Sequence, residues 1–307
     1  MVPRATLADA RLAVSACRGD GREASGGKSG QSSSARNWIV TKFCFAAGLA
    51  MLAGATPVFA QDDQARLALD NLVAAYPSAL AGHDGRVLRW RDGTAMPVSD
   101  GTDSKTLAKF LRHASILDQF RIPYPRGSLE KPPAVDADPG RFRNTAFFTK
   151  MYGDCQKGEV SPHLVSLVWL PKTLANKTFA NKALSKSIRV TSVNGVDERL
   201  RAVSAEIDAL PENIKGAAYP IAGTYNCRTV ADTGQPSPHG YGIAIDLNTA
   251  LSDYWYWRPH SGAILYRNRM PQEIVAIFEK HGFIWGGKWY HFDTMHFEFR
   301  PELLVAR

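Results

Sequence analysis

Apolar residues recur with the period of an α-helix in two stretches of the second half of the chain. One face of the first stretch carries Val196, Leu200, Val203, Ile207 and Leu210, spaced by four, three, four and three residues. This spacing predicts an amphipathic helix whose apolar side packs on a core. A second helix is predicted to begin at Pro271 and to end at Gly282, because proline suits a first helical turn and glycine a C-terminal cap.

Shorter apolar runs around these helices have the length of strands. They lie at 164–170 (closed by Pro171), 187–193, 224–230, 242–248, 284–285 and 291–299. Apolar runs of this length, separated by turn residues, are typical of strands in a small sheet that lies in the core. We therefore expect an α+β fold in which a small antiparallel sheet is flanked by helices.

The first half of the chain has a less regular pattern. Residues 65–75 predict a helix, and an Asp-Gly turn within 87–94 predicts a hairpin. Ser104 is the predicted cap of the next helix. Five prolines from Pro123 to Pro139 indicate an extended connection, and a short helix then runs towards Tyr152. A boundary near Gly153 makes 61–152 an N-terminal region, for which wall binding and packing are both open roles, and 153–307 a second domain.

Residues 1–60 have the features of an export presequence. Arg36 and Lys42 accompany an apolar stretch from Phe43 to Ala55, and the segment ends in a small-residue cleavage site, VFA. The sequence predicts a signal peptide at 36–60, cut after Ala60, and a periplasmic or secreted protein with no stable membrane span after cleavage. A single-pass anchor is the alternative, although the apolar stretch is short for a bilayer of ~30 Å. Residues 1–35 show no periodicity, and a translation start near Val40 would omit them.

Composition and charge narrow the class of protein. Of 307 residues, 45% are hydrophobic and 21% charged, which is typical of a folded globular protein rather than a disordered one. No apolar run reaches roughly 18 residues, which excludes a multi-span membrane protein. Residues 1–60 hold seven Lys and Arg against three Asp and Glu, so the remaining chain contributes only part of the net charge of +8. That mild excess fits contact with an acidic polymer such as cell wall and predicts no nucleic-acid partner.

Cys155 and Cys227 are the cysteines that would remain after the predicted cleavage. In an oxidising compartment a disulfide between them and two separate buried thiols are both compatible with the sequence.

Two polar segments near the C-terminus could supply a metal site. His239 and Asp246 are separated by glycines that let the chain turn from a loop into a strand, and His296 would come from a neighbouring strand. Three nitrogen or oxygen ligands with one open position make a catalytic zinc site. Asp293 has the wrong parity for the face of His296, so we expect it in a turn or bulge beside the metal, where a general base acts. The other histidines, at 163, 260, 281 and 291, compete for the ligand role.

Two common hydrolase motifs are missing from the sequence. There is no H-E-x-x-H, the paired histidines of a zinc-peptidase helix, and no G-x-S-x-G, the turn that carries a nucleophilic serine. Spacing alone therefore leads no further than a His/Asp/His metal site in an exported α+β protein.

The segments SPHGYGIAID, GFIWGGKW and DTMHFEFRPEL together resemble the family of zinc D-alanyl-D-alanine carboxypeptidases and L-alanyl-D-glutamate endopeptidases, within the hedgehog/D-Ala-D-Ala-peptidase superfamily. The resemblance spans about 160–303. It implies that His239, Asp246 and His296 bind Zn²⁺ and that Asp293 is the catalytic carboxylate. Many carboxypeptidase and dipeptidase members have Glu at that position, whereas Asp resembles the L-alanyl-D-glutamate branch.

The same resemblance implies roles for further residues. Arg228 would face the substrate carbonyl or carboxylate, with an exposed strand position as the alternative. Ser237 would hydrogen-bond the substrate or shape the loop, and Trp285 would line the cleft or belong to the core. Glu298, two residues beyond His296, is expected to orient a ligand histidine rather than to bind the metal.

The expected protein is an exported zinc metallopeptidase that hydrolyses peptidoglycan stem peptides in the manner of an L-alanyl-D-glutamate endopeptidase. A D,D-carboxypeptidase or cross-link endopeptidase of peptidoglycan is an alternative within the family. A non-catalytic, zinc-containing cell-wall-binding module is the alternative outside it, and Asp293 argues against that reading because a structural site has no need of a base.

Overall fold

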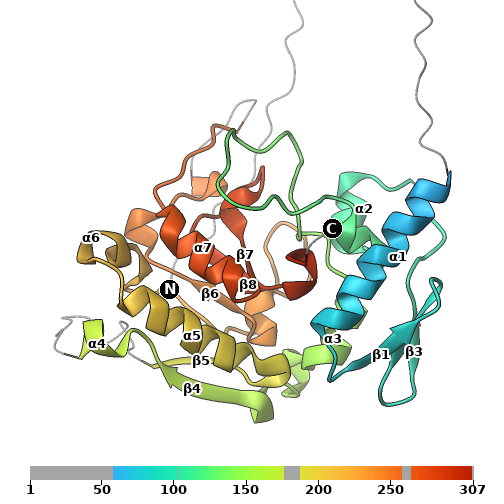
Figure 1. Ribbon diagram of the computed structural model, residues 1–307, viewed down its shortest axis with the longest axis horizontal. Helices are drawn as coiled ribbons and strands as arrows, with labels where there is room; N and C mark the ends of the chain where they lie inside the picture. The colour runs from blue at the N-terminus through green and yellow to red at the C-terminus, as the bar shows by residue number, and fades with distance from the viewer. Residues whose placement is uncertain (1–57, 103, 176–186, 258–263, 306–307) are drawn as a thin grey trace, which may run out of the picture. The chain divides into compact units, whose positions relative to one another are not determined.

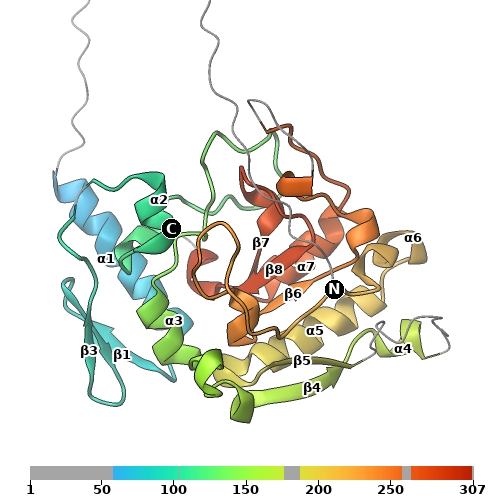
Figure 2. The ribbon, with the colours of Figure 1, turned by 180° about the vertical axis from the view of Figure 1, so that it is seen from behind.

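A three-stranded antiparallel sheet forms the centre of the C-terminal half in the computed structural model (Figures 1 and 2). Strand β8 (His296–Phe299) lies between β6 (Ala244–Asp246) and β7 (Phe283–Trp285). In the β6–β8 register, Asp246 is directly opposite His296. The predicted α+β class and small antiparallel sheet are confirmed.

The structure describes residues 58–102, 104–175, 187–257 and 264–305. All of them lie within Ala55–Arg307, which is one compact unit. The part of the predicted signal peptide before Val58 lies outside the described residues.

Helices and a two-stranded ribbon surround the central sheet. The ribbon pairs β4 (Leu164–Val168) with β5 (Ser187–Thr191) and contacts α5 (Val196–Asp208), as Figure 1 shows. Helix α7 (Gln272–Lys280) packs on the sheet through Phe278, whose ring stacks on Phe297 with 3.9 Å between centroids. Two short helices, α4 (Pro171–Leu174) and α6 (Glu212–Lys215), complete this half.

The N-terminal region adds a helix, a small sheet and two shorter helices. They are α1 (Val58–Ala75), the antiparallel strands β1 (Leu80–His83), β2 (Val87–Trp90) and β3 (Ala95–Pro97), α2 (Leu107–Arg112) and α3 (Thr145–Tyr152). The buried side chains of α1 and α3 belong to the same hydrophobic cluster as those of α5 and α7. Residues 61–152 therefore share a core with the rest of the unit. The division near Gly153 stays a prediction.

Several predicted elements have the right type but different ends. The helices at 196 and 271–282 and the hairpin around Asp92 are confirmed. The cap of α2 is Thr106 rather than Ser104, since the Thr106 hydroxyl accepts the Lys109 amide. The run 224–230 forms no ladder and makes only isolated bridges at its edges, and β8 begins at His296 rather than at 291.

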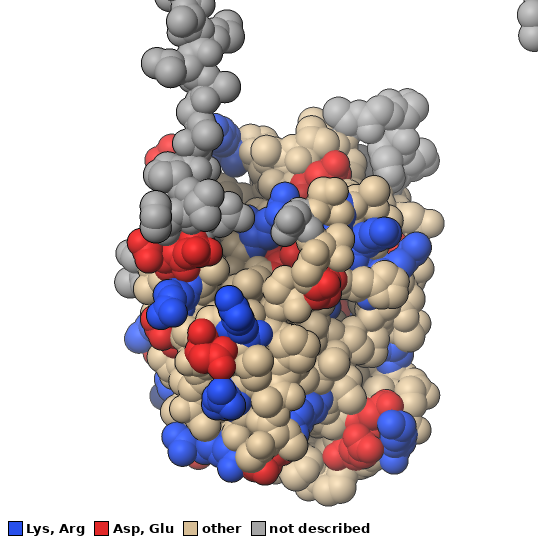
Figure 3. All heavy atoms as spheres, turned by 90° about the vertical axis from the view of Figure 1, so that its right-hand side faces the viewer, with Lys and Arg blue, Asp and Glu red and all other residues tan. Residues whose placement is uncertain are grey.

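The described segments include no helix long and apolar enough to cross a bilayer. On the face drawn in Figure 3, Lys and Arg side chains are interspersed with Asp and Glu rather than gathered into a single basic area.

Candidate metal centre

His239 lies on a short 3-10 helix, η6 (Pro238–Tyr241), that turns the chain into β6. Ser237 caps this helix, its hydroxyl accepting the His239 amide at 3.3 Å. Gly242 follows with φ = 73°, and a Cβ there would lie 2.9 Å from the Thr191 nitrogen. Only glycine fits this turn without strain. The turn leads the chain from His239 on η6 to Asp246 on β6.

His239, Asp246 and His296 converge on one point. One ligand atom from each can be chosen so that all lie within 4.8 Å of one another. Nε2 of His239 is 3.3 Å from Nδ1 of His296, and the two Asp246 oxygens lie 3.2 Å and 2.9 Å from these nitrogens. Both imidazoles are buried, with 2% of His239 and 6% of His296 exposed. Segments 50 residues apart thus deliver three donor atoms to one small volume.

The outer nitrogen of each imidazole is occupied, and this determines the tautomer. Nδ1 of His239 donates to the Thr224 carbonyl at 2.6 Å, since a carbonyl can only accept. Nε2 of His296 lies 3.2 Å from a Glu298 carboxylate oxygen. When each outer nitrogen holds its proton, both inner nitrogens point lone pairs at Asp246. Two lone pairs and a carboxylate facing one another fit a zinc ion.

Electrostatics in the cluster also favour a positive charge at its centre. Although burial lowers it, hydrogen bonds and the charges of Asp246 and Glu298 raise the pKa of His296 to about 10. Burial raises the pKa of Asp246, but the two imidazoles hold it well below its usual range. The surroundings therefore stabilise a cation among these three side chains.

Asp293 lies in the turn before β8, where strand parity predicted a turn or bulge. Its carbonyl accepts the His296 amide at 3.3 Å, and its own amide donates to Gly286. Its Oδ1 is buried and has no hydrogen-bond partner within the described chain. Burial and the charge of Asp246 raise the pKa of Asp293 to about 7. In the site without a metal, this carboxyl can exchange a proton near neutral pH.

A family model described as D-alanyl-D-alanine carboxypeptidase matches residues 231–299. The match supports a peptidase of this family. It covers the four residues His239, Asp246, Asp293 and His296 but less than half of the chain, so it supports the family relationship only at a coarse level. No curated protein and no solved structure matches the chain.

The remaining predicted residues have different surroundings. Arg228 is exposed. Burial and the charge of Asp293 raise the pKa of Tyr254, and the positive charge of Arg228 opposes this rise. Arg228 and Asp293 therefore both lie near this tyrosine. Ser237 is 1% exposed and caps η6, which agrees with loop shaping. Glu298 is fully buried and holds His296, as expected of an orienting residue.

Trp285 corrects one expectation. It is 1% exposed, and its indole nitrogen donates to the Thr294 carbonyl at 2.9 Å. A side chain so enclosed cannot line a cleft, so the core alternative holds and the substrate-binding assignment is wrong.

Cys155 and Cys227 form a disulfide. The sulfur of Cys155 packs against η6, since a Cβ added to Gly240 would lie 3.2 Å from it. The disulfide therefore holds the loop that contains Arg228 against η6, the helix that carries His239.

Three contacts of the site could not be found from motifs. They are Thr224, which fixes His239, and two residues of the N-terminal region, Asp138 and Arg143, which bond His291 and Glu298. Asp138 and Arg143 are 153 and 155 residues from their partners. The only signal near them was the proline-rich connection, which indicated extended chain.

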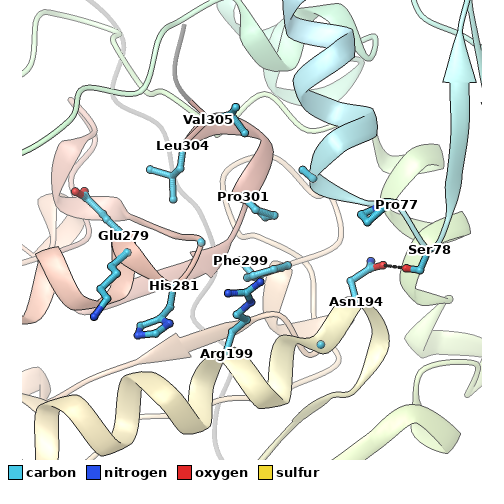
Figure 4. A pocket seen from close by; sticks show the side chains of 14 residues that line it. Pro77, Ser78, Asn194, Arg199, Glu279, His281, Phe299, Pro301, Leu304 and Val305 are labelled. Atoms are coloured by element: carbon cyan, nitrogen blue, oxygen red, sulfur yellow. Dashed lines mark hydrogen bonds between the residues drawn. The ribbon is translucent and has the colours of Figure 1, made fainter.

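The molecule also has a pocket of about 540 Å³ away from these residues, between the end of α1, the start of α5 and the residues after β8 (Figure 4). Arg199 and His281 line it, and Ser78 hydrogen-bonds Asn194 at its edge. None of the proposed metal ligands is among its lining residues.

Proposed function

We propose that this protein is an exported zinc metallopeptidase that hydrolyses peptidoglycan stem peptides, with the bond between L-alanine and D-glutamate as its target. One observation carries the proposal. Within the segment that matches the carboxypeptidase family, His239, Asp246 and His296 converge beside the buried carboxylate of Asp293, whose Oδ1 has no hydrogen-bond partner in the described chain.

Each residue has a distinct task in this proposal. When bound, zinc supplies Lewis acidity, lowering the pKa of a water towards ~7 and polarising the scissile carbonyl. Asp293 accepts the proton of the attacking water at Oδ1 and passes it to the leaving amine. Thr224 and Glu298 hold the two imidazoles in the required tautomer. Arg228, which is exposed, binds the oxyanion or a substrate carboxylate.

D,D-carboxypeptidase activity is the second candidate, and the description of the matching family favours it. Asp rather than Glu at position 293 favours the L-alanyl-D-glutamate endopeptidase. The two activities differ in the products they release, because the first removes a terminal D-alanine and the second separates the peptide behind L-alanine.

Mass spectrometry of muropeptides digested by the zinc-loaded protein tests the proposal. We expect fragments cut after L-alanine, and no such fragments from the His296→Ala variant. Loss of D-alanine alone would assign the carboxypeptidase activity instead. Intact muropeptides with a zinc-loaded wild type would favour the non-catalytic wall-binding module.

The ligand set has its own test. His239→Ala, Asp246→Ala and His296→Ala should each lose most of the metal, because two ligands bind zinc far more weakly than three. His291→Ala should keep one zinc per chain, since His291 contacts Asp138 rather than the cluster. Elemental analysis of the purified variants measures both. A His291→Ala protein without zinc beside a His296→Ala protein with zinc would overturn the assignment.

A further inference from the structure

Residues 137–143, which we call the supporting segment, run along the chain that carries Asp293 and His296. The Tyr290 amide donates to the Ala137 carbonyl at 2.9 Å, and the Trp289 indole donates to the Pro139 carbonyl at 2.7 Å. His291 donates its amide and its Nδ1 to the two oxygens of Asp138, at 2.9 Å and 2.7 Å. The three consecutive residues 289–291, which end two positions before Asp293, are therefore all bonded to this segment.

Arg143 extends the contact to β8. Its Nε and one terminal nitrogen donate to the two Glu298 oxygens, at 3.1 Å and 2.6 Å. Glu298 is fully buried, and one of these oxygens faces Nε2 of His296 at 3.2 Å. This bidentate interaction fixes the plane of the Glu298 carboxylate, and the carboxylate in turn orients the ring of His296, the proposed ligand.

The backbone of the supporting segment comes close to the central sheet. Gly140 has φ = 90°, and a Cβ there would lie 2.5 Å from Cδ1 of Ile284 on β7. Its carbonyl accepts a bond from Arg300 at 2.7 Å. The positive φ favours glycine at this position, where the segment packs against Ile284, and three residues further on Arg143 lies next to Glu298. In Figures 1 and 2 the green connection from α2 to α3 extends to the part of the molecule that holds α7 and β7.

We propose that the supporting segment positions the metal centre, with Arg143 as a positioning residue that acts through Glu298 on His296. The inference rests on the proposed zinc site. It assigns a role to part of the N-terminal region, outside the residues that match the family. Without Arg143, the Glu298 carboxylate keeps one contact with Arg300 at 3.2 Å, besides the His296 ring that it has to orient. One contact from Arg300 does not fix the plane of the carboxylate. The Nδ1 lone pair of His296 then loses its fixed direction towards the metal.

The test compares zinc affinity between the full-length wild type and Arg143→Gln, measured by competition with a chromophoric chelator. We expect the dissociation constant to rise about 10–100-fold, the usual effect of removing an outer partner of a metal ligand. The absorption spectrum of the Co²⁺-substituted protein should change as well, because it reports ligand geometry. Arg143→Lys keeps the charge but not the bidentate interaction, and it should recover part of the affinity.

Arg201→Gln is the matched control. Arg201 makes an equally short ion pair, 2.6 Å to the buried Asp197, but on α5 and away from the cluster. Its zinc affinity should equal that of the wild type.

Three results would overturn the inference. Wild-type affinity and an unchanged Co²⁺ spectrum in Arg143→Gln would do so, and so would an equal loss of affinity in Arg201→Gln, which would indicate general destabilisation. If Arg143→Gln does not fold, Arg143→Lys becomes the test variant, and wild-type affinity there would count against the inference. A wild type that binds no zinc would remove the proposed function itself, which distinguishes the two failures.

Discussion

Two carboxylates of the site, Asp246 and Asp293, have opposite proton affinities because their neighbours differ. Asp246 lies between two imidazoles, which favour its ionised form over the cost of burial. Asp293 is buried with an unpartnered oxygen and faces the charge of Asp246, so its pKa rises to about 7. When the environment separates the pKa values of two carboxyl groups in this way, the two groups commonly take different roles. Here Asp246 stays ionised as the proposed ligand, and Asp293 carries the proton.

Replacing Asp293 with Asn tests the second role. The amide keeps the shape and one acceptor oxygen but cannot take up a proton at neutral pH. Peptide hydrolysis should fall about 10²–10⁴-fold, the usual contribution of a positioned acid or base, while one zinc per chain remains. Turnover of a stem-peptide substrate and metal content, measured on the same preparation, give the result. An Asn variant with its zinc and wild-type turnover would remove Asp293 from the mechanism.

Asp293→Glu is the informative companion. It adds one methylene and shifts the carboxylate by about 1 Å, a displacement that can cost on the order of 100-fold. We expect partial activity, between the wild type and the Asn variant. Glu298 cannot substitute as base in either variant, because its oxygens are already bonded to Arg143, Arg300 and His296.

At the scale of elements, the sequence predicted the parts of the site that depend on local pattern. Glycines after His239 and the parity of Asp293 indicated a turn into a strand and a bend before β8, and both are present. The run 224–230 misled because its Thr and Val residues suit a strand. In the structure Cys227 is tied to Cys155, and the neighbouring residues turn back on themselves from Thr229 to Pro236. The disulfide and the turn decide this segment, and neither has a periodic signal.

The supporting segment shows what local pattern cannot supply. Nothing near Asp138 or Arg143 in the sequence names a partner more than 150 residues away. Only the fold brings together a proline-rich connection and the chain before β8. The prediction of extended chain was compatible with this contact but did not specify it.

The Asp138–His291 contact should make stability depend on pH. Burial raises the pKa of Asp138, but the hydrogen bond from His291 and the charge of Arg141 lower it below its ordinary value overall. A carboxyl whose pKa is lower in the folded state adds stability above its unfolded pKa of about 3.9 and loses that contribution as pH falls towards the folded value. The difference in unfolding free energy between wild type and Asp138→Asn should therefore be largest near pH 7 and shrink below about pH 4.

Urea unfolding at a series of pH values measures this difference. Asp70→Asn is a suitable control, because Asp70 is exposed and pairs with His83 within the N-terminal region. A difference between wild type and Asp138→Asn that stays constant from neutral to acid pH would contradict the prediction.

At the scale of the whole molecule, the disulfide between Cys155 and Cys227 joins the segments that precede and follow strands β4 and β5 in the sequence. The disulfide closes a loop between residues 72 positions apart. On the chain-entropy model its reduction should lower the unfolding free energy by roughly 3–5 kcal/mol. Because Cys155 supports the turn of His239, reduction should also weaken zinc binding. Urea unfolding of oxidised and reduced protein measures the first effect. Two free thiols per chain in the denatured, unreduced mature protein, whose cysteines are Cys155 and Cys227, would contradict the bridge.

The last prediction concerns the start of the mature chain. The signal features of residues 36–60 predict cleavage after Ala60, within the first turn of α1 as the structure draws it. Buried contacts of α1 begin at Leu69, whereas Asp62 and Asp63 are exposed. Cleavage after Ala60 therefore keeps the buried side chains that the structure describes in α1, and it leaves two acidic residues at the new helix N-terminus, where negative charge is stabilising. N-terminal sequencing of exported protein should read QDDQA, and its urea midpoint should match that of uncleaved protein. A cytoplasmic product that keeps residues 1–60 would contradict export.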